Sequence, residues 1–306
     1  MFRFISKFFE KRRTLALRRS RVLLAQGSRI DPGTRFVNGF GEGCFLELGA
    51  GARIDRNVEV DISSASVRIG SGTFIHSGAS IYGDVIFGDH CLISKNLYAS
   101  SGGHSIALPC YIRHCDSIAP SVPRSLPIRV HDDVWIGYNV FIKPGITIGK
   151  GAVAGALSVI TKNVPPYTVV GGSAAKMIKN RLPFVPPPVL LSYQKEHLPY
   201  FYSGFGQSGM ESCGDGYLVV KETICLSVPN DFLGGEIVVI GNTLVQNGLS
   251  LSPSGVGDTF PPGSFQLRLF APAEAVITQF GYLKFIFFRV DSVDAGTRIV
   301  EVRYGR

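Results

Sequence analysis

An apolar residue recurs at every sixth position through three stretches of this chain, and that period restricts the possible folds more than any other feature. One series contains Ile69, Ile75, Ile81, Phe87, Ile93 and Ala99, and another contains Ile136, Ile142, Ile148, Ala154 and Ile160. An earlier, weaker series contains Ile30, Phe36, Leu48, Ile54 and Val60, and Glu42 interrupts it. A period of six fits neither an α-helix nor an isolated alternating strand.

The period predicts an all-β solenoid of the parallel β-helix type. Each hexapeptide supplies one short strand and one turn, three of them complete a triangular coil, and stacked coils pair their backbones about 4.8 Å apart. Each coil then buries its apolar residues only against its neighbours, so the fold needs several coils and a cap at each end. Gly follows the apolar residue in Ile69-Gly70 and Ile136-Gly137, where a corner requires unusual backbone angles. A β-sandwich with a chance period is the less economical alternative.

Breaks in the period divide the chain into four parts. Residues 27–182 form the predicted β-helix, with an inserted loop over 100–127 where the repeat stops and resumes. Residues 183–190 are rich in proline and read as a stiff linker. Residues 191–306 contain apolar runs separated by Gly, Ser, Asn and Pro, which predicts an antiparallel, sandwich-like accessory domain. Residues 1–26 are expected to form a basic amphipathic helix.

Charge and cysteine content exclude several classes of protein. The chain has a net charge of +8, but residues 1–21 contain eight Lys or Arg against one Glu, so nearly all the excess is N-terminal. Nucleic-acid binding by the rest of the chain is therefore not expected, whereas residues 1–21 either cap the first coil or contact an anionic membrane surface. Six cysteines without a CxxC pair, and no secretory signal, favour a cytoplasmic protein, and membrane contact by residues 1–21 would place it at the inner face of the membrane.

Residues 128–181 carry a more specific pattern: VWIG, then PGITIG, then TKNVPPY. This pattern resembles the hexapeptide-repeat acetyltransferases, and among them the maltose, galactoside and capsular-polysaccharide O-acetyltransferases. The resemblance extends over 27–182. It implies a left-handed coil, acetyl-coenzyme A as co-substrate, a saccharide acceptor, and a homotrimer with active sites between subunits.

The inserted loop contains the predicted catalytic base, His104. In the resembling family a His at this place removes the proton of the acceptor hydroxyl. Imidazole titrates near pH 6.5 and can accept that proton and return it to the departing thiol. His114, in the same loop, is the alternative base. Relatives often have a polar residue directly before this His, whereas Gly102 and Gly103 precede it here.

The resemblance also implies further site residues. Trp135, the only tryptophan, either donates its indole N–H to the oxyanion of the tetrahedral intermediate or packs at a coil corner. The expected coenzyme contacts comprise residues along the pantetheine, a pair near the adenine nucleotide, and lysines that meet phosphates: Tyr138, Ala156, Thr161, Lys162, Lys176 and Lys179. Arg181 is a weaker phosphate candidate.

Together these features predict an acetyl-coenzyme A-dependent O-acetyltransferase of a saccharide, with a surface or capsular polysaccharide or its precursor as acceptor. An N-acetyltransferase of an amino sugar or antibiotic is the alternative within enzymes. A non-catalytic, glycan-binding trimer is the alternative outside them. No metal is expected, because the histidine pair four residues apart that a γ-type carbonic anhydrase needs is absent from the sequence.

Overall fold

The computed structural model describes residues 21–104, 111, 126–182, 184–206, 218–244, 246–252, 255, 257–279, 283–291 and 297–305. The chain divides into two compact units, Met1–Pro183 and Phe184–Arg306. Most of the predicted N-terminal helix lies outside the described residues, as do His114 and most of the inserted loop. Where that helix prediction can be compared, it is wrong, because Val22–Leu24 form a strand that pairs with Leu46–Leu48.

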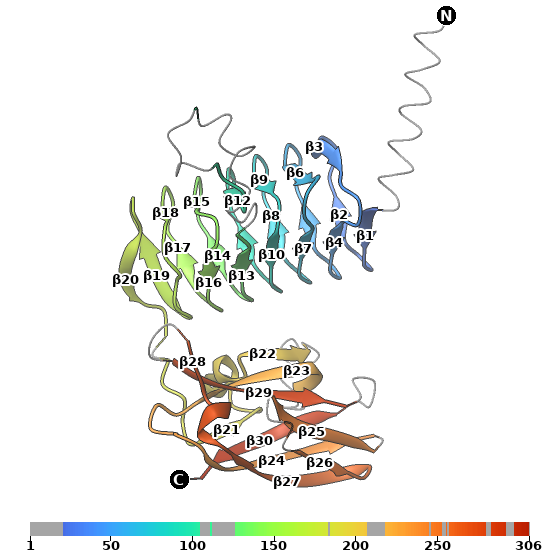
Figure 1. Ribbon diagram of the computed structural model, residues 1–306, viewed down its shortest axis with the longest axis vertical. Coiled ribbons are helices and arrows are strands. Elements are labelled where there is room, and N and C mark those ends of the chain that lie inside the picture. The colour runs from blue at the N-terminus through green and yellow to red at the C-terminus, as the bar shows by residue number, and fades with distance from the viewer. Residues whose placement is uncertain are drawn as a thin grey trace, which may run out of the picture. The chain divides into compact units, whose positions relative to one another are not determined.

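The first unit is a parallel β-helix, as the six-residue period predicts, with its coils stacked side by side (Figure 1), and it has the left hand that the resemblance implies. Three parallel sheets form the sides of the coil. Sheet A contains β1 (Val22–Leu24), β4 (Leu46–Leu48), β7 (Val67–Ile69), β10 (Val85–Phe87), β13 (Ile128–Val130) and β16 (Thr147–Ile148). Sheet B contains β2 (Arg29–Ile30), β5 (Arg53–Ile54), β8 (Phe74–Ile75), β11 (Leu92–Ile93), β14 (Trp135–Ile136), β17 (Val153–Ala154), β19 (Thr168–Gly171) and β20 (Lys176–Asn180). Sheet C contains β3 (Arg35–Phe40), β6 (Glu59–Ile62), β9 (Ser80–Tyr82), β12 (Tyr98–Ser100), β15 (Phe141–Ile142) and β18 (Val159–Ile160).

The repeating apolar residues form the core of this coil. Ile93 pairs with Ile136 on sheet B, and Ala99 pairs with Ile81 and Ile142 on sheet C. Every member of the two later series is buried, whereas Ile30 and Phe36 of the first are only half-buried. Glu42, which interrupts that first series, is exposed. The six-residue period is therefore most regular where its residues are fully buried.

Two kinds of residue occupy the corners of the coil, residues with a positive φ and closely packed glycines. Asn57, Asn96, Asn139 and Leu157, at equivalent corners between sheets B and C, have φ between 56° and 62°. The unusual backbone angles expected at Gly70 are not observed; instead, a Cβ there would lie 2.4 Å from the carbonyl carbon of Gly88 in the next coil. The antiparallel strand β20 ends the coil by pairing with β19.

The second unit is almost entirely antiparallel β-structure, as the sequence predicts. Its elements are β21 (Val189–Leu191), η1 (Lys195–Tyr200), β22 (Ser203–Gly206), β23 (Leu218–Val228), β24 (Gly235–Thr243), β25 (Asn247–Ser252), β26 (Gly257–Phe260), β27 (Gly263–Ala271), η3 (Ala273–Ala275), β28 (Ile277–Gln279), β29 (Leu283–Val290) and β30 (Arg298–Tyr304). Hydrogen bonds join these strands into one continuous sheet, and burial alternates along β27. The alternation indicates that the sheet has one face on an apolar core.

The predicted linker over 183–190 does not end where the sequence suggests. Leu190 is fully buried in the core of the second unit, and β21 pairs with β30. The end of the proline-rich segment is therefore part of the second unit. Among the residues that the structure describes, no helix has both the length and the apolar character needed to cross a bilayer.

Candidate active site

The base of the inserted loop is anchored by Ser101, which directly follows β12. The backbone N–H of Ser101 donates to the carbonyl of Tyr82 at 2.9 Å, and its own carbonyl accepts from the N–H of Leu126 at 2.8 Å. Its buried side-chain Oγ accepts from the N–H of Asp84 at 2.8 Å. His104 lies three residues beyond this anchor and is exposed. The predicted base therefore leaves the coil at a fixed point of the edge between sheets C and A.

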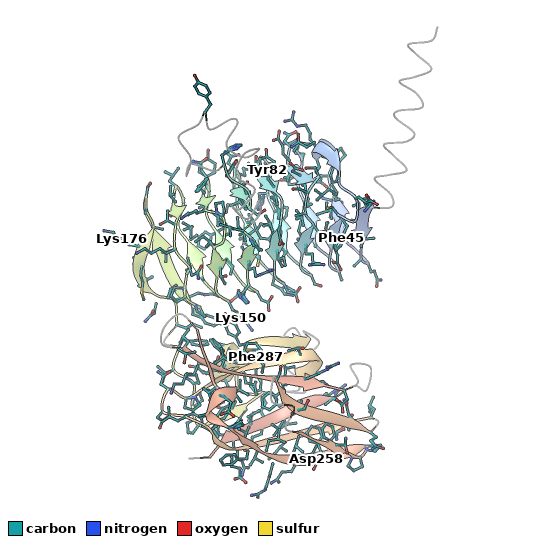
Figure 2. All side chains as sticks on the ribbon, in the orientation of Figure 1. Phe45, Tyr82, Lys150, Lys176, Asp258 and Phe287 are labelled. Carbon is teal, nitrogen blue, oxygen red and sulfur yellow. The ribbon has the colours of Figure 1, made fainter. Side chains whose placement is uncertain are left out.

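His104 borders a groove of about 740 Å³ on the outer face of sheet C. The groove is lined by Val37, Asn38, Asp61, Ser64, Tyr82, Gly83, Tyr98, Ser100, Ser101, Gly102, Gly103, His104, Phe141 and Pro144. Tyr98 and Phe141 are 41% and 37% exposed, so apolar ring surface faces solvent close to the imidazole. Tyr82, labelled in Figure 2, comes from the preceding strand of the same sheet. The groove thus combines a histidine with exposed aromatic rings and several polar groups.

Sequence analysis did not identify the rings or the polar groups of this groove. Tyr98 and Phe141 directly precede the inward residues Ala99 and Ile142, so a period-two reading of each strand places them on the outer face. The sequence signal that could have identified this groove was the recurrence of aromatic residues at outward positions of successive strands.

Tyr138 and Ala156 lie together on the edge between sheets B and C. They occupy equivalent corners of successive coils, and the carbonyl of Tyr138 accepts from the N–H of Leu157 at 2.8 Å. The Tyr138 hydroxyl accepts from Asn96 Nδ2 at 3.3 Å, and its side chain is half exposed. Adjacent exposed corners of this kind leave backbone and side-chain groups accessible to an extended ligand.

Thr161 and Lys162 follow β18 on the edge between sheets C and A, the same edge that carries His104. Lys176 and Lys179 are exposed on the terminal strand β20, and Figure 2 shows Lys176 projecting outward. Sheet C is therefore flanked by both groups of predicted coenzyme contacts, Tyr138 and Ala156 on one edge, Thr161 and Lys162 on the other.

Arg181, the weaker phosphate candidate, is engaged elsewhere. Its Nη1 donates to Asp133 Oδ2 and to the carbonyl of Gly151, both at 2.9 Å. These contacts lie at the corners between sheets A and B, away from Tyr138 and Ala156. Arg181 therefore ties the end of β20 to the coil.

Trp135 is separated from His104 within one chain. It lies on sheet B, where it is 50% exposed and its Nε1 donates to Ser94 Oγ at 3.4 Å. It does not line the groove beside His104. A joint role for the two residues would require the sheet B face of a second protomer.

His131 differs from His104 in its environment. It follows β13 between sheets A and B, and burial lowers the pKa of its imidazole. Its carbonyl accepts from the thiol of Cys91 at 3.0 Å. Within the described part of the chain, no three His, Cys, Asp or Glu side chains are grouped as metal ligands would be.

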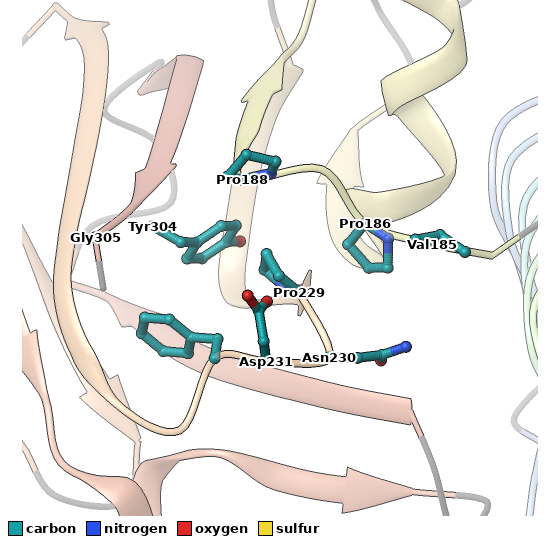
Figure 3. Close-up of a pocket in the computed structure, with 9 residues that line it drawn as sticks. Val185, Pro186, Pro188, Pro229, Asn230, Asp231, Tyr304 and Gly305 are labelled. Carbon is teal, nitrogen blue, oxygen red and sulfur yellow. The ribbon is translucent and has the colours of Figure 1, made fainter.

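A second pocket, of about 640 Å³, lies within the second unit (Figure 3). Pro186 and Pro188, from the segment before β21, and Tyr304, from β30, line it together with Asp231. Its lining residues include no histidine or cysteine, so it offers no imidazole or thiol for acyl transfer. The groove on sheet C is the stronger candidate for the reaction.

Comparison with known proteins gives three informative similarities. Galactoside O-acetyltransferase of Escherichia coli K12 is 32% identical over 137 residues, which are 44% of this chain and 64% of that protein. Chloramphenicol acetyltransferase of Morganella morganii is 34% identical over 119 residues, 35% of this chain and 57% of that enzyme. The hexapeptide-repeat containing acetyltransferase VCA0836 of Vibrio cholerae, solved with acetyl coenzyme A, is 31% identical over 44% of this chain and 70% of that protein, with a TM-score of 0.39.

The chain spans 64%, 41% and 57% of the lengths of the first three curated relatives that it matches. No family model matches it. The identity to curated acetyltransferases nevertheless exceeds 30%, and the six-residue period forms the observed coil. The chain therefore belongs to the hexapeptide-repeat acetyltransferases.

Proposed function

We propose that this protein transfers an acetyl group from acetyl-coenzyme A to a hydroxyl of a saccharide, with His104 as general base. One observation carries the proposal: an exposed imidazole borders a groove that also presents exposed aromatic rings and hydroxyl and carboxylate groups. Sugars have apolar C–H surfaces and many hydroxyls, so they match such a lining. The similarity to galactoside O-acetyltransferase points in the same direction.

The proposed reaction is a direct transfer. The neutral imidazole of His104 accepts the proton of the acceptor hydroxyl while the oxygen bonds to the thioester carbonyl carbon. The tetrahedral oxyanion then collapses, the carbon–sulfur bond breaks, and the imidazolium returns its proton to the sulfur. No covalent bond to the protein is needed.

We propose that the coenzyme lies beside sheet C. Tyr138 and Ala156 would contact its pantetheine arm, Thr161 and Lys162 its adenine nucleotide, and Lys176 and Lys179 its phosphates. Five of these six residues are exposed and Thr161 is half-buried, which supports this assignment.

A homotrimer is part of the proposal. The outer face of sheet B exposes Leu92 by 44% and Trp135 by 50%, on adjacent strands. Apolar surface of this kind is typical of an interface. A second protomer seated there would bring Trp135 of one chain toward His104 of another, where the indole N–H can stabilise the oxyanion.

The decisive experiment measures thiol release from acetyl-coenzyme A with neutral saccharides, amino sugars and chloramphenicol as acceptors, followed by mass spectrometry of the products. We expect an alkali-labile ester on a neutral saccharide. An amide on an amino sugar would support the N-acetyltransferase alternative. Saccharide binding without thiol release would support the non-catalytic alternative.

His104→Ala tests the assigned base. We expect kcat to fall by about 10²–10⁴-fold while the Kd for acetyl-coenzyme A stays the same. His197→Asn is the matched control, because His197 lies in the second unit and its Nδ1 accepts from the N–H of Leu191, a role that the Asn oxygen preserves. Near-normal turnover by His104→Ala would reject the mechanism.

A further inference from the structure

The groove beside His104 extends along the coil well beyond the residues that surround the histidine. Its lining residues come from five successive strands of sheet C, from β3 to β15. Adjacent strands lie about 4.8 Å apart, so four steps extend the groove over about 19 Å along the coil. His104 follows β12 and lies toward one end, whereas Asn38 and Asp61 lie toward the other. A single sugar ring at His104 would leave the far end empty.

An apolar ridge occupies the part of the groove nearest His104. The rings of Tyr98 and Phe141 are stacked with centroids 5.4 Å apart, and the ring of Tyr82 meets Tyr98 edge-on at 5.8 Å. Tyr82 is held in turn by its hydroxyl, which donates to Glu59 Oε2 at 2.6 Å. The ridge is therefore ordered before any ligand binds, which lowers the entropic cost of binding.

The far end of the groove offers fixed hydrogen-bond acceptors. Asp61 Oδ1 accepts from the N–H of Ser63 at 2.8 Å, and Asp61 Oδ2 accepts from Asn38 Nδ2 at 2.7 Å. A carboxylate has about four acceptor sites, so these two bonds orient Asp61 and leave it able to accept from ligand hydroxyls. Ser64 adds an exposed hydroxyl at the same end.

The charges of the residues that line the groove indicate which class of sugar substrate it accepts. Among the described residues that line the groove, none is Lys or Arg, and Asp61 is the one carboxylate. A nucleotide-linked sugar lying along the groove would bring its pyrophosphate beside the negative charge of Asp61. The lining suits a neutral chain of sugars better than a sugar nucleotide.

From these observations, and resting on the function proposed above, we propose that the acceptor is a neutral oligosaccharide chain that lies along sheet C. The reacting sugar sits at His104 against Tyr98 and Phe141, and a sugar further along the chain donates hydroxyls to Asp61. The length of the oligosaccharide is then a determinant of specificity, because only a chain of several sugars reaches both ends of the groove.

The test uses the full-length protein and measures both glycan binding and acetyl transfer. Binding is measured on an array of neutral mono-, di-, tri- and tetrasaccharides with dTDP-glucose as the nucleotide-linked probe, and acetyl transfer is measured on the same compounds. We expect the trisaccharides to exceed the monosaccharides in affinity and in kcat/KM by about tenfold or more, the effect of one added hydrogen bond to a charged group. We expect dTDP-glucose to bind more weakly than the trisaccharides.

Two variants locate the effect. Asp61→Ala should lower the ratio of trisaccharide to monosaccharide kcat/KM by about tenfold, whereas Phe45→Leu should leave that ratio unchanged. Phe45 is a suitable control because it precedes β4 on sheet A and packs under Arg68, outside the groove. A ratio that Asp61→Ala does not change, a preference for dTDP-glucose, or binding to no glycan would each overturn the inference.

The ridge can also be tested as an interface between copies of this chain. If Tyr98→Ala changes the mass measured by light scattering and leaves glycan binding intact, a second protomer covers the ridge and the inference is overturned. The two proposals fail separately. Oligosaccharide binding without acetyl transfer would reject the enzyme and keep the groove assignment, whereas efficient transfer to monosaccharides alone would do the reverse.

Discussion

The rings of Tyr98 and Phe141 stack with 5.4 Å between their centroids and 8° between their planes, from paired positions of β12 and β15. Stacking here is a direct consequence of the coil, because equivalent outward residues of successive coils lie one strand spacing apart. The same register that aligns the buried isoleucines therefore aligns the exposed rings next to His104.

The two rings should stabilise each other measurably. In a double-mutant cycle of Tyr98→Ala and Phe141→Ala, we expect a coupling of about 0.5–1.5 kcal/mol in the free energy of unfolding. Urea unfolding of the four proteins, followed by circular dichroism, provides the measurement. A coupling of about zero would mean that the stack does not persist in solution.

Lys176 and Lys179 should contribute to coenzyme affinity through charge. Neutralising both, as Lys176→Gln with Lys179→Gln, removes two cations from β20 and should raise the KM for acetyl-coenzyme A several-fold with little change in kcat. The difference from wild type should shrink at high salt, because exposed charges are screened. Lys195→Gln, an exposed lysine of the second unit, is the control. An equal effect of the control would show that only net charge matters.

Gly70 should tolerate no side chain, because of close packing between coils. An alanine Cβ would lie 2.4 Å from the carbonyl carbon of Gly88 and 2.5 Å from Asp89 Oδ1. We expect Gly70→Ala to lower the free energy of unfolding by about 3 kcal/mol. At Gly103 a Cβ meets no atom of the described residues within 4 Å, so Gly103→Ala should leave stability nearly unchanged. Similar midpoints of thermal unfolding for both variants would contradict the steric explanation.

Cys91 should make the β-helix sensitive to alkali. Burial raises the pKa of its thiol to about 12 from an ordinary value of 9.0. The folded state thus holds this proton more tightly than the unfolded state, so the stabilisation is complete below about pH 9 and is lost as the pH rises toward 12. Over that range the group lowers the free energy of unfolding by at most about 1.4 kcal/mol per pH unit.

The measurement compares the pH dependence of urea unfolding in Cys91→Ala and in the wild type between pH 8 and 11. We expect a shallower decline in the variant, and an unchanged decline in Cys44→Ala, whose residue is only half-buried. Parallel curves for the wild type and Cys91→Ala would show that the thiol does not ionise differently in the two states.

Much of the β-helix could be predicted from residue spacing. The two later series of apolar residues, which run from Ile69 to Ala99 and from Ile136 to Ile160, lie in the core as the period requires. A polar residue at such an inward position would cost free energy, because its polar group would be removed from water. In the second unit, the apolar runs become β23, β24, β27, β28, β29 and β30. β25 and β26 had no such signal, because Gly, Ser and Asn make up most of NGLSLS in β25, and GDTF in β26 contains only one large apolar residue, Phe260. Their pairing with neighbouring strands decides their structure.

Residue spacing alone was enough to predict the coil, its register and the point at which His104 leaves it, because buried positions recur at a fixed interval along the chain. Which residues share a surface with that histidine depends on how the coil folds in three dimensions. Outward positions carry no packing constraint, so their spacing does not reveal that Asp61, Tyr98 and Phe141 line one groove. Nor does it reveal that Trp135 faces a different side of the coil, since a shift of one hexapeptide, a third of a coil, changes the face on which a residue lies.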